Sequence, residues 1–175
     1  MTSDGLDRKS GGNDLSSDSD ERGGRARHAV PSPVTRHSLP AAPFSFPIRI
    51  YWEDTDAGGI VYYANYFKFM ERARTEWLRT FGIEQLTLQQ EQGLIFVVVD
   101  VEAHFRRPAR YGDLIDATCE VAESTRTSLT FKQEIYRQGA GGELLLDGRV
   151  RVACLDAQKY RPRALPERLL QEKSE

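Results

Sequence analysis

One long helical pattern dominates the chain. Between residues 65 and 81, large apolar side chains recur three and four positions apart, the spacing of an amphipathic helix with one buried face. Asn65 is placed to cap the start of this helix and Gly82 to end it. The expected buried positions are Tyr66, Phe69, Met70, Ala73, Trp77 and Phe81. No other segment has so long a helical pattern, so a sheet in this protein would pack against this helix.

Strand patterns account for most of the remaining folded chain. Residues 44–52 alternate, with Phe46, Ile48, Ile50 and Trp52 on one side. Apolar or alternating runs then cover residues 94–105, 114–122, 128–137 and 143–156. Short connections favour antiparallel pairing. With short helices expected near residues 83–93 and at the C-terminal end, the pattern predicts an α+β fold in which about five strands wrap one helix.

Residues 1–43 have a different composition from residues 44–175. They are rich in Ser, Asp, Gly and Pro, with scattered arginines and almost no large apolar residues. Such a segment buries too little apolar surface to offset its ordering entropy. We predict a disordered tail over residues 1–43, either inert or docking through its basic part, and a folded domain over residues 44–175.

Composition excludes several classes of protein. The net charge of -2 and the pI near 6.0 give no basic field for nucleic acid. Cys119 and Cys154 are too few for a disulfide framework and lie in strand-like runs, as buried thiols in a reducing compartment would. The sequence shows neither a membrane span nor the apolar core of a secretory signal, so we expect a cytoplasmic protein.

Most catalytic motifs are absent. The sequence contains no GxSxG, HExxH, CxxC, GxGxxG or Walker pattern. Residues 54–59, DTDAGG, begin like a calcium loop, but Asn65 stands where the bidentate Glu is required. His104 is the one histidine of the predicted domain, so a catalytic Ser–His or Cys–His pair is disfavoured. We therefore expect no metal and no cofactor.

The remaining candidate is the acidic loop before the long helix. Asp54 and Asp56 precede a glycine pair, and free N–H groups at a helix start can hold a developing oxyanion. A carboxylate there could attack a carbonyl or activate water, and a thioester suits so small a site. The alternative is that both aspartates are turn or capping residues.

The stretch IRIYWEDTDAGGIVYYANYFKFMERARTEWLR strongly resembles the start of hotdog-fold acyl-CoA thioesterases. It is similar to the family related to 4-hydroxybenzoyl-CoA thioesterase, especially the Tol-Pal-associated (YbgC-type) branch. The likeness continues through FVVVDVEAHFRRPARYGDLI, TRTSLTFKQEIYR and KYRPRALP, over about residues 46–170. It implies a hotdog fold, in which one long central helix is wrapped by a five- or six-stranded antiparallel sheet. It also implies an acyl-CoA substrate, homodimers or homotetramers with interfacial sites, and peripheral association with a membrane or cell-envelope complex.

The resemblance also implies site residues. Asp56 matches the catalytic carboxylate, as nucleophile or general base, and the backbone N–H near Tyr63 would polarise the thioester carbonyl. The branch usually carries VYH where this chain has VYY, so Tyr63 replaces a histidine; its hydroxyl could donate a hydrogen bond or its ring could simply pack. Gly59 belongs to the same loop. Arg107 and Arg110 are candidates for coenzyme A phosphates or a solvated charge cluster, and Ser128 could line the pocket mouth.

Two other functions remain open. One is a non-catalytic acyl-CoA or lipid-binding hotdog module, against which an intact Asp56 counts. The other is a hotdog dehydratase or hydratase, which relies on a histidine paired with an acid. We expect His104 to pack on a strand, which makes that reading a poor fit.

Overall fold

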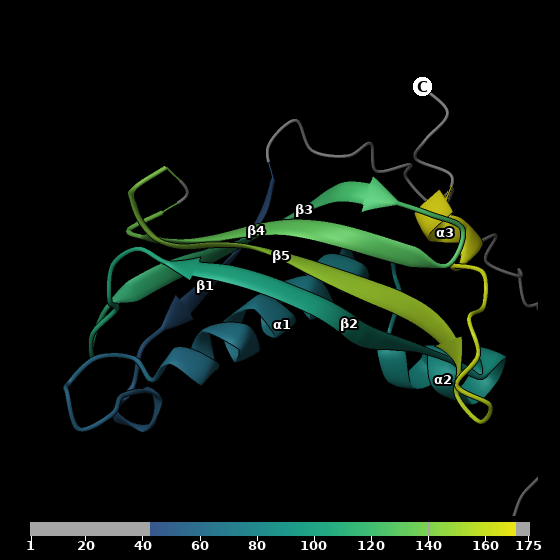
Figure 1. The fold of residues 1–175 in the computed structure, drawn as a ribbon, viewed down its shortest axis with the longest axis horizontal. Helices are drawn as coiled ribbons and strands as arrows, with labels where there is room; N and C mark the ends of the chain where they lie inside the picture. Colours follow the sequence, from purple (N-terminus) through teal and green to yellow (C-terminus); the bar gives the residue numbers. More distant parts are fainter. Residues whose placement is uncertain (1–42, 140, 171–175) are drawn as a thin grey trace, which may run out of the picture. The chain divides into compact units, whose positions relative to one another are not determined.

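The computed structural model describes residues 43–139 and 141–170 (Figure 1). The predicted tail therefore lies outside the described residues, except for Pro43. The described elements are β1 (Phe44–Arg49), a 3-10 turn (Trp52–Asp54), α1 (Tyr63–Thr80), α2 (Gln85–Gln92), β2 (Leu94–Phe105), β3 (Leu114–Ser124), β4 (Ser128–Arg137), β5 (Glu143–Asp156) and α3 (Glu167–Leu170). Both short helices were expected from the sequence.

The strands form one antiparallel five-stranded sheet in the order β1-β3-β4-β5-β2. Helix α1 lies along one face of this sheet, below the strands in Figure 1, and packs against β1 and β3. The predicted fold, one long helix against an antiparallel sheet, is confirmed. None of the helices described is long and apolar enough to cross a membrane.

The apolar stripe of α1 forms the centre of the core. Phe69, Met70 and Ala73 are fully buried, and the ring of Trp77 meets that of Phe131 edge to face at 5.2 Å. Burying one large apolar side chain contributes about 1.5–3 kcal/mol. The helix is therefore fixed to the sheet along its length, and its first turn is fixed with it.

A buried polar network crosses this core. Arg74 donates from Nη1 to Oε1 of Gln133 at 2.7 Å, and Nε2 of Gln133 donates to the carbonyls of Met70 and Thr118. Gln133 is completely buried, and burial lowers the pKa of Arg74. These bonds satisfy polar groups that would otherwise destabilise the helix–sheet interface.

The two ends of α1 show one error and one success of the sequence analysis. Gly82 has φ +67° and donates to the carbonyl of Arg79, while Ile83 donates to that of Leu78, the Schellman pattern that ends a helix. The prediction of Asn65 as N-cap was wrong, because α1 begins at Tyr63 and Tyr62 occupies the cap position. Asn65 lies buried in the first turn and bonds the preceding loop instead.

The first strand is also shorter than predicted. It ends at Arg49, and Trp52 lies in the 3-10 turn with 70% of its surface exposed, not on the inward side of a strand. The reason is a local bond, since Oδ2 of Asp54 accepts from the Tyr51 N–H at 2.9 Å and turns the chain away from the sheet. Ile48 and Ile50 are buried as expected.

Strand β2 forms one edge of the sheet and is unusually apolar for an edge. Val98 and Val99 are each 45% exposed and Val101 is 43% exposed, beside an irregularity in the pairing between Val98 and Asp100. An exposed apolar edge strand is a template for pairing with another chain.

The cysteines give a test of the core. Cys119 and Cys154 are buried free thiols, and burial raises the pKa of Cys119 to about 12 and raises that of Cys154. Because the thiolate is the reactive form, we expect neither thiol to react with iodoacetamide at pH 8 in the folded protein. Mass spectrometry should find both alkylated in urea, and rapid alkylation of the folded protein would contradict this packing.

Candidate active site

Asp56 lies in a tight loop whose backbone closes on itself. Its N–H donates to the carbonyl of Ile60 at 2.9 Å, and its carbonyl accepts from the N–H of Gly59 at 3.0 Å. Gly59 has φ +71°, a left-handed conformation that favours glycine. Oδ1 of the Asp56 carboxylate accepts from the N–H of Gly58 at 2.8 Å. Within the described chain Oδ2 has no donor, so one oxygen of this exposed carboxylate is fixed in direction and the other is available.

The loop is joined to a second segment of the chain. The Val61 N–H donates to the Ala109 carbonyl at 2.9 Å, and Ile60 forms an antiparallel bridge with Arg110. Residues 60–61 and 109–110 therefore act as a short added ladder beyond the sheet. This ladder explains how Arg110, far from Asp56 in the sequence, comes to the same end of the domain.

Asp54 shapes the loop. Its carboxylate accepts from the Tyr51 N–H, and its carbonyl accepts from the Tyr62 N–H and from Nδ2 of Asn65, both at 2.9 Å. Asn65 thus ties the loop to the first turn of α1. The sequence analysis assigned Asn65 to the cap and missed this role; the signal available was a polar side chain on the buried side of the helix.

The N-terminus of α1 follows directly. At helix positions one and two, the N–H groups of Tyr63 and Ala64 have no acceptor in the described part of the chain, as expected at a helix start. The side chain of Tyr63 is 58% exposed and its ring lies 4.7 Å from that of Tyr62. A hydrogen bond with Tyr63 raises the pKa of Tyr62. An exposed carboxylate and free helix N–H groups are thus neighbours at one end of the domain.

The other predicted residues divide into two groups. Arg110 shares the Asp56 end, and Arg107 lies just beyond β2, where its Nε is 3.9 Å from Glu143. Ser128 opens β4 at the opposite end from Arg137, and its hydroxyl lies 2.8 Å from that of Thr125. One chain does not bring Ser128 to Asp56, so its substrate-binding role stays a prediction for a site completed by a second copy.

His104 lies on β2 beside acids but away from Asp56. Its Nε2 is 3.3 Å from Glu102, and it is paired across the sheet with Asp147. The next residue, Phe105, turns to the other face, where its ring meets Tyr66 at 5.5 Å. A histidine–acid site involving Asp56 is therefore not formed within the described chain.

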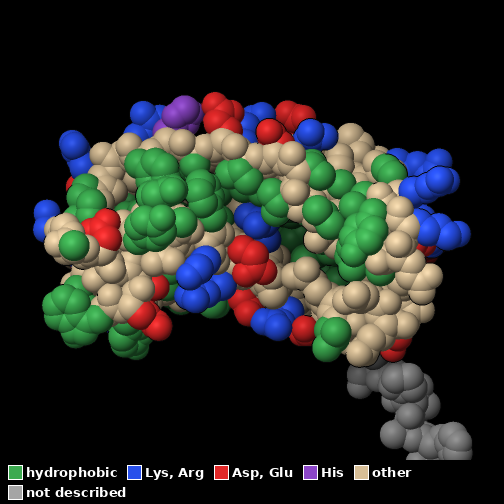
Figure 2. Space-filling model, turned by 60° about the horizontal axis from the view of Figure 1, so that its bottom comes forward, with side chains coloured by type: hydrophobic (Ala, Val, Ile, Leu, Met, Phe, Trp, Pro, Cys, Tyr) green, Lys and Arg blue, Asp and Glu red, His purple; other side chains and the backbone are tan. Residues whose placement is uncertain are grey.

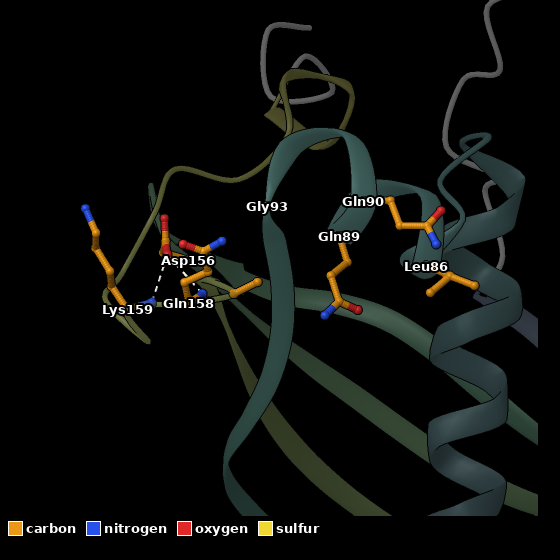
Figure 3. A pocket seen from close by; sticks show the side chains of 8 residues that line it. Leu86, Gln89, Gln90, Gly93, Asp156, Gln158 and Lys159 are labelled. Carbon is orange, nitrogen blue, oxygen red and sulfur yellow. Dashed lines mark hydrogen bonds between the residues drawn. The ribbon is translucent and has the colours of Figure 1, made fainter.

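A hollow lies at the other end of β2, near Gly93. A pocket of about 610 Å³ lies between α2 and the turn after β5, around Gly93 (Figure 3). The carboxylate of Asp156 at its rim accepts from the N–H groups of Gln158 and Lys159, which lower its pKa together with Arg163. No group of His, Cys, Asp and Glu side chains among the described residues could hold a metal ion.

Comparison with known proteins identifies the family of this chain. Residues 58–143 match the family model described as the thioesterase superfamily. The acyl-CoA thioesterase YbgC of Haemophilus influenzae is 45% identical over 123 residues, covering 70% of this chain and 88% of the relative. The chain belongs to the thioesterase superfamily. It is a thioesterase.

Other relatives agree. The acyl-CoA thioester hydrolase YbgC of Escherichia coli is 43% identical over 129 residues, covering 74% of this thioesterase and 94% of the relative. A probable thioesterase from Bartonella henselae is 32% identical with a TM-score of 0.67, covering 71% of this chain and 100% of the other. A 1,4-dihydroxy-2-naphthoyl-CoA thioesterase from Synechocystis, 18% identical, has a TM-score of 0.69 and covers 75% and 95% of the two chains. The last likeness shows the hotdog fold alone.

Tyr66 provides a test of how the site is held. Its buried hydroxyl accepts from the Ala109 N–H at 2.8 Å, and burial is the main reason that its pKa is raised. We expect Tyr66→Phe to lower the free energy of unfolding by about 1–3 kcal/mol, because the buried N–H loses its acceptor. Urea unfolding would measure this. Tyr160→Phe, which removes an exposed hydroxyl, should leave stability unchanged; equal effects would contradict the assignment.

Proposed function

We propose that this thioesterase hydrolyses acyl-CoA thioesters to the free acid and coenzyme A, with Asp56 as the catalytic carboxylate. The observation that carries the proposal is that Oδ2 of Asp56 and the N–H groups of Tyr63 and Ala64 share one end of the domain and have no partner among the described residues. Sequence similarity also supports the proposal, because relatives at 43–45% identity are named acyl-CoA thioesterase or acyl-CoA thioester hydrolase.

Two routes fit this site. In the first, Oδ2 of Asp56 attacks the thioester carbon, the carbon–sulfur bond breaks, coenzyme A leaves as the thiol after taking a proton, and water cleaves the resulting anhydride. In the second, Asp56 takes a proton from water, whose oxygen attacks the same carbon; the carbon–sulfur bond then breaks, and Asp56 returns the proton to the leaving sulfur. In both routes negative charge develops on the carbonyl oxygen, which the N–H groups at the start of α1 would stabilise.

The remaining site residues are proposed to bind substrate. Gly59 keeps the loop small enough for close approach to the thioester, since its Cβ position faces open space. The guanidinium of Arg110 has no side-chain partner among the described residues, and the side chain of Arg107 is 69% exposed, with a long ion pair of 3.9 Å to Glu143. Both are proposed to contact the phosphates of coenzyme A. The Tyr63 hydroxyl is proposed to donate a hydrogen bond to the substrate, because a phenol O–H is a hydrogen-bond donor.

A homodimer formed through β2 would complete the site. Antiparallel pairing of β2 with its copy places the Leu94 end of one strand beside the Phe105 end of the other. The pocket around Gly93 and the nearby Ser128 of one subunit would then face the Asp56 end of its partner. We propose this arrangement because it covers an apolar edge and brings together predicted residues that one chain separates. Tetramers and cell-envelope association rest on the branch resemblance alone, and a cytoplasmic location rests on the two free thiols.

Asp56→Asn is expected to lower kcat by about 10²-fold or more while leaving the fold intact, the usual size for losing a positioned acid–base group. Free-thiol release from a panel of short, long and aromatic acyl-CoAs measures this. Asp54→Asn should cost less, and the matched control Glu53→Gln, on an exposed side chain of the same loop, should cost nothing. Turnover equal to wild type in Asp56→Asn would refute the catalytic assignment. Absence of turnover in wild type with saturable acyl-CoA binding would favour the non-catalytic module.

Val99→Lys is expected to convert the dimer to monomer and to lower kcat/KM at least tenfold, because a charge on an edge strand opposes pairing. Light scattering after size exclusion reports the mass. Leu114→Lys alters an exposed apolar side chain on β3, away from the β2 edge, and should leave the dimer intact. A wild-type monomer with full activity would contradict the dimer proposal but not the catalytic role of Asp56.

A further inference from the structure

An exposed aromatic stack lies at the Asp56 end of the domain. The rings of Trp52 and Tyr111 are 4.1 Å apart and inclined by only 14°, so they lie nearly parallel. Trp52 is 70% exposed and Tyr111 50% exposed. The 51–62 loop lies on the left in Figure 1, and Figure 2 shows hydrophobic side chains at the same end. Two exposed aromatic rings held nearly parallel form a flat apolar surface, and exposed apolar surfaces can mark ligand-binding sites.

The stack is held by backbone bonds on both sides. The Ile50 N–H donates to the Asp113 carbonyl at 2.9 Å, and the Gly112 N–H donates to the Ile50 carbonyl at 3.0 Å. The Trp52 carbonyl accepts from the N–H and the hydroxyl of Thr55. The loops that carry the two rings are thus fixed to each other, and the platform is formed before any ligand arrives.

Charged side chains of both signs lie near the stack, because Glu53, Asp54 and Asp56 follow Trp52 and Arg110 precedes Tyr111. Arg110 directly precedes Tyr111, and its guanidinium has no side-chain partner among the described residues. The neighbouring acid, Asp113, is occupied, because its Oδ2 accepts from Nε of Arg137 and from the Arg110 N–H, both at 2.9 Å. Arg107 approaches an acid no closer than the 3.9 Å to Glu143. Arg110 therefore adjoins the aromatic stack in the sequence, and the exposed Arg107 lies in the same segment, four residues before Tyr111.

We propose that Trp52 and Tyr111 form the subsite for the adenine ring of coenzyme A. This inference rests on the proposed acyl-CoA hydrolysis, in which coenzyme A is the leaving group, and it states where the adenine of that group binds. An adenosine phosphate joins a flat purine to anionic groups, which matches a parallel aromatic stack beside guanidinium groups. The exposed face of Trp52 stacks on the base, Arg107 and Arg110 contact the phosphates, and the pantetheine arm runs from there towards Asp56.

Substrate truncation tests the subsite. Trp52→Ala is compared with wild type on an acyl-CoA and on the same acyl group carried by phosphopantetheine, which lacks the adenosine. We expect KM for the acyl-CoA to rise about tenfold with kcat unchanged, since stacking of one base is worth about this much. KM for the acyl-phosphopantetheine should not change. Trp52→Phe should restore most of the affinity because it keeps a stacking ring.

Other outcomes overturn the inference. An equal loss on both substrates, or a fall in kcat, would mean that Trp52 merely shapes the Asp56 loop. No loss on either would mean that the base binds elsewhere. Failure of wild type to turn over any thioester would instead count against the proposed function. The adenine subsite would then be tested by measuring nucleotide binding directly.

Tryptophan fluorescence supplies that binding measurement. Trp52 and Trp77 are the two tryptophans of the chain, so the fluorescence of a Trp77→Phe variant comes from Trp52 alone. Trp77 is only 5% exposed, and its replacement leaves the surface of the proposed subsite unchanged. Adenosine 3′,5′-bisphosphate should quench this emission to saturation, and inorganic phosphate should not. Absence of quenching refutes the subsite. A blue shift with phosphatidylglycerol vesicles and no response to the nucleotide would refute it too, and would show a membrane-facing patch.

Discussion

The packing of α1 against the sheet is the interaction on which the other features depend. The apolar stripe of the helix, centred on Phe69, Met70 and Ala73, has no water contact, and the strands supply the matching surface. Because the helix cannot slide or rotate without exposing this stripe, its first turn is fixed relative to the sheet. That fixed turn presents the N–H groups of Tyr63 and Ala64, and it is where the Asp56 loop attaches.

The candidate site is a polar structure built on this apolar one. Asn65 and Tyr66 are adjacent in the sequence, and each bonds a different loop: Asn65 holds the carbonyl of Asp54, and Tyr66 accepts from the N–H of Ala109. The same helical turn therefore positions both the acidic loop and the segment that carries Arg110. A carboxylate placed this way needs no histidine to be held in direction, since the Gly58 N–H already orients it.

Sequence periodicity predicted the elements well where burial was their cause. Strand β2 matches its predicted range, residues 94–105, and β5 its predicted range, residues 143–156, because alternating or continuous apolar runs leave little choice of register. The errors fall where a polar side chain bonds the backbone of the loop before α1. The carboxylate of Asp54 ends the first strand before Trp52, and the loop contact of Asn65 moves the helix start to Tyr63. Patterns of hydrophobicity contain no information about such bonds.

The sequence by itself determined the fold class, the thioesterase family and Asp56 as the residue to examine, because motif and periodicity are local properties of the chain. Only the tertiary structure decided which distant residues share the Asp56 end. It brought Arg110 there through the bridge to Ile60, left Ser128 at the far end of β4 and turned Trp52 outward onto Tyr111. These placements follow from strand order and from backbone bonds between loops separated by about fifty residues or more in the chain, which no local pattern encodes.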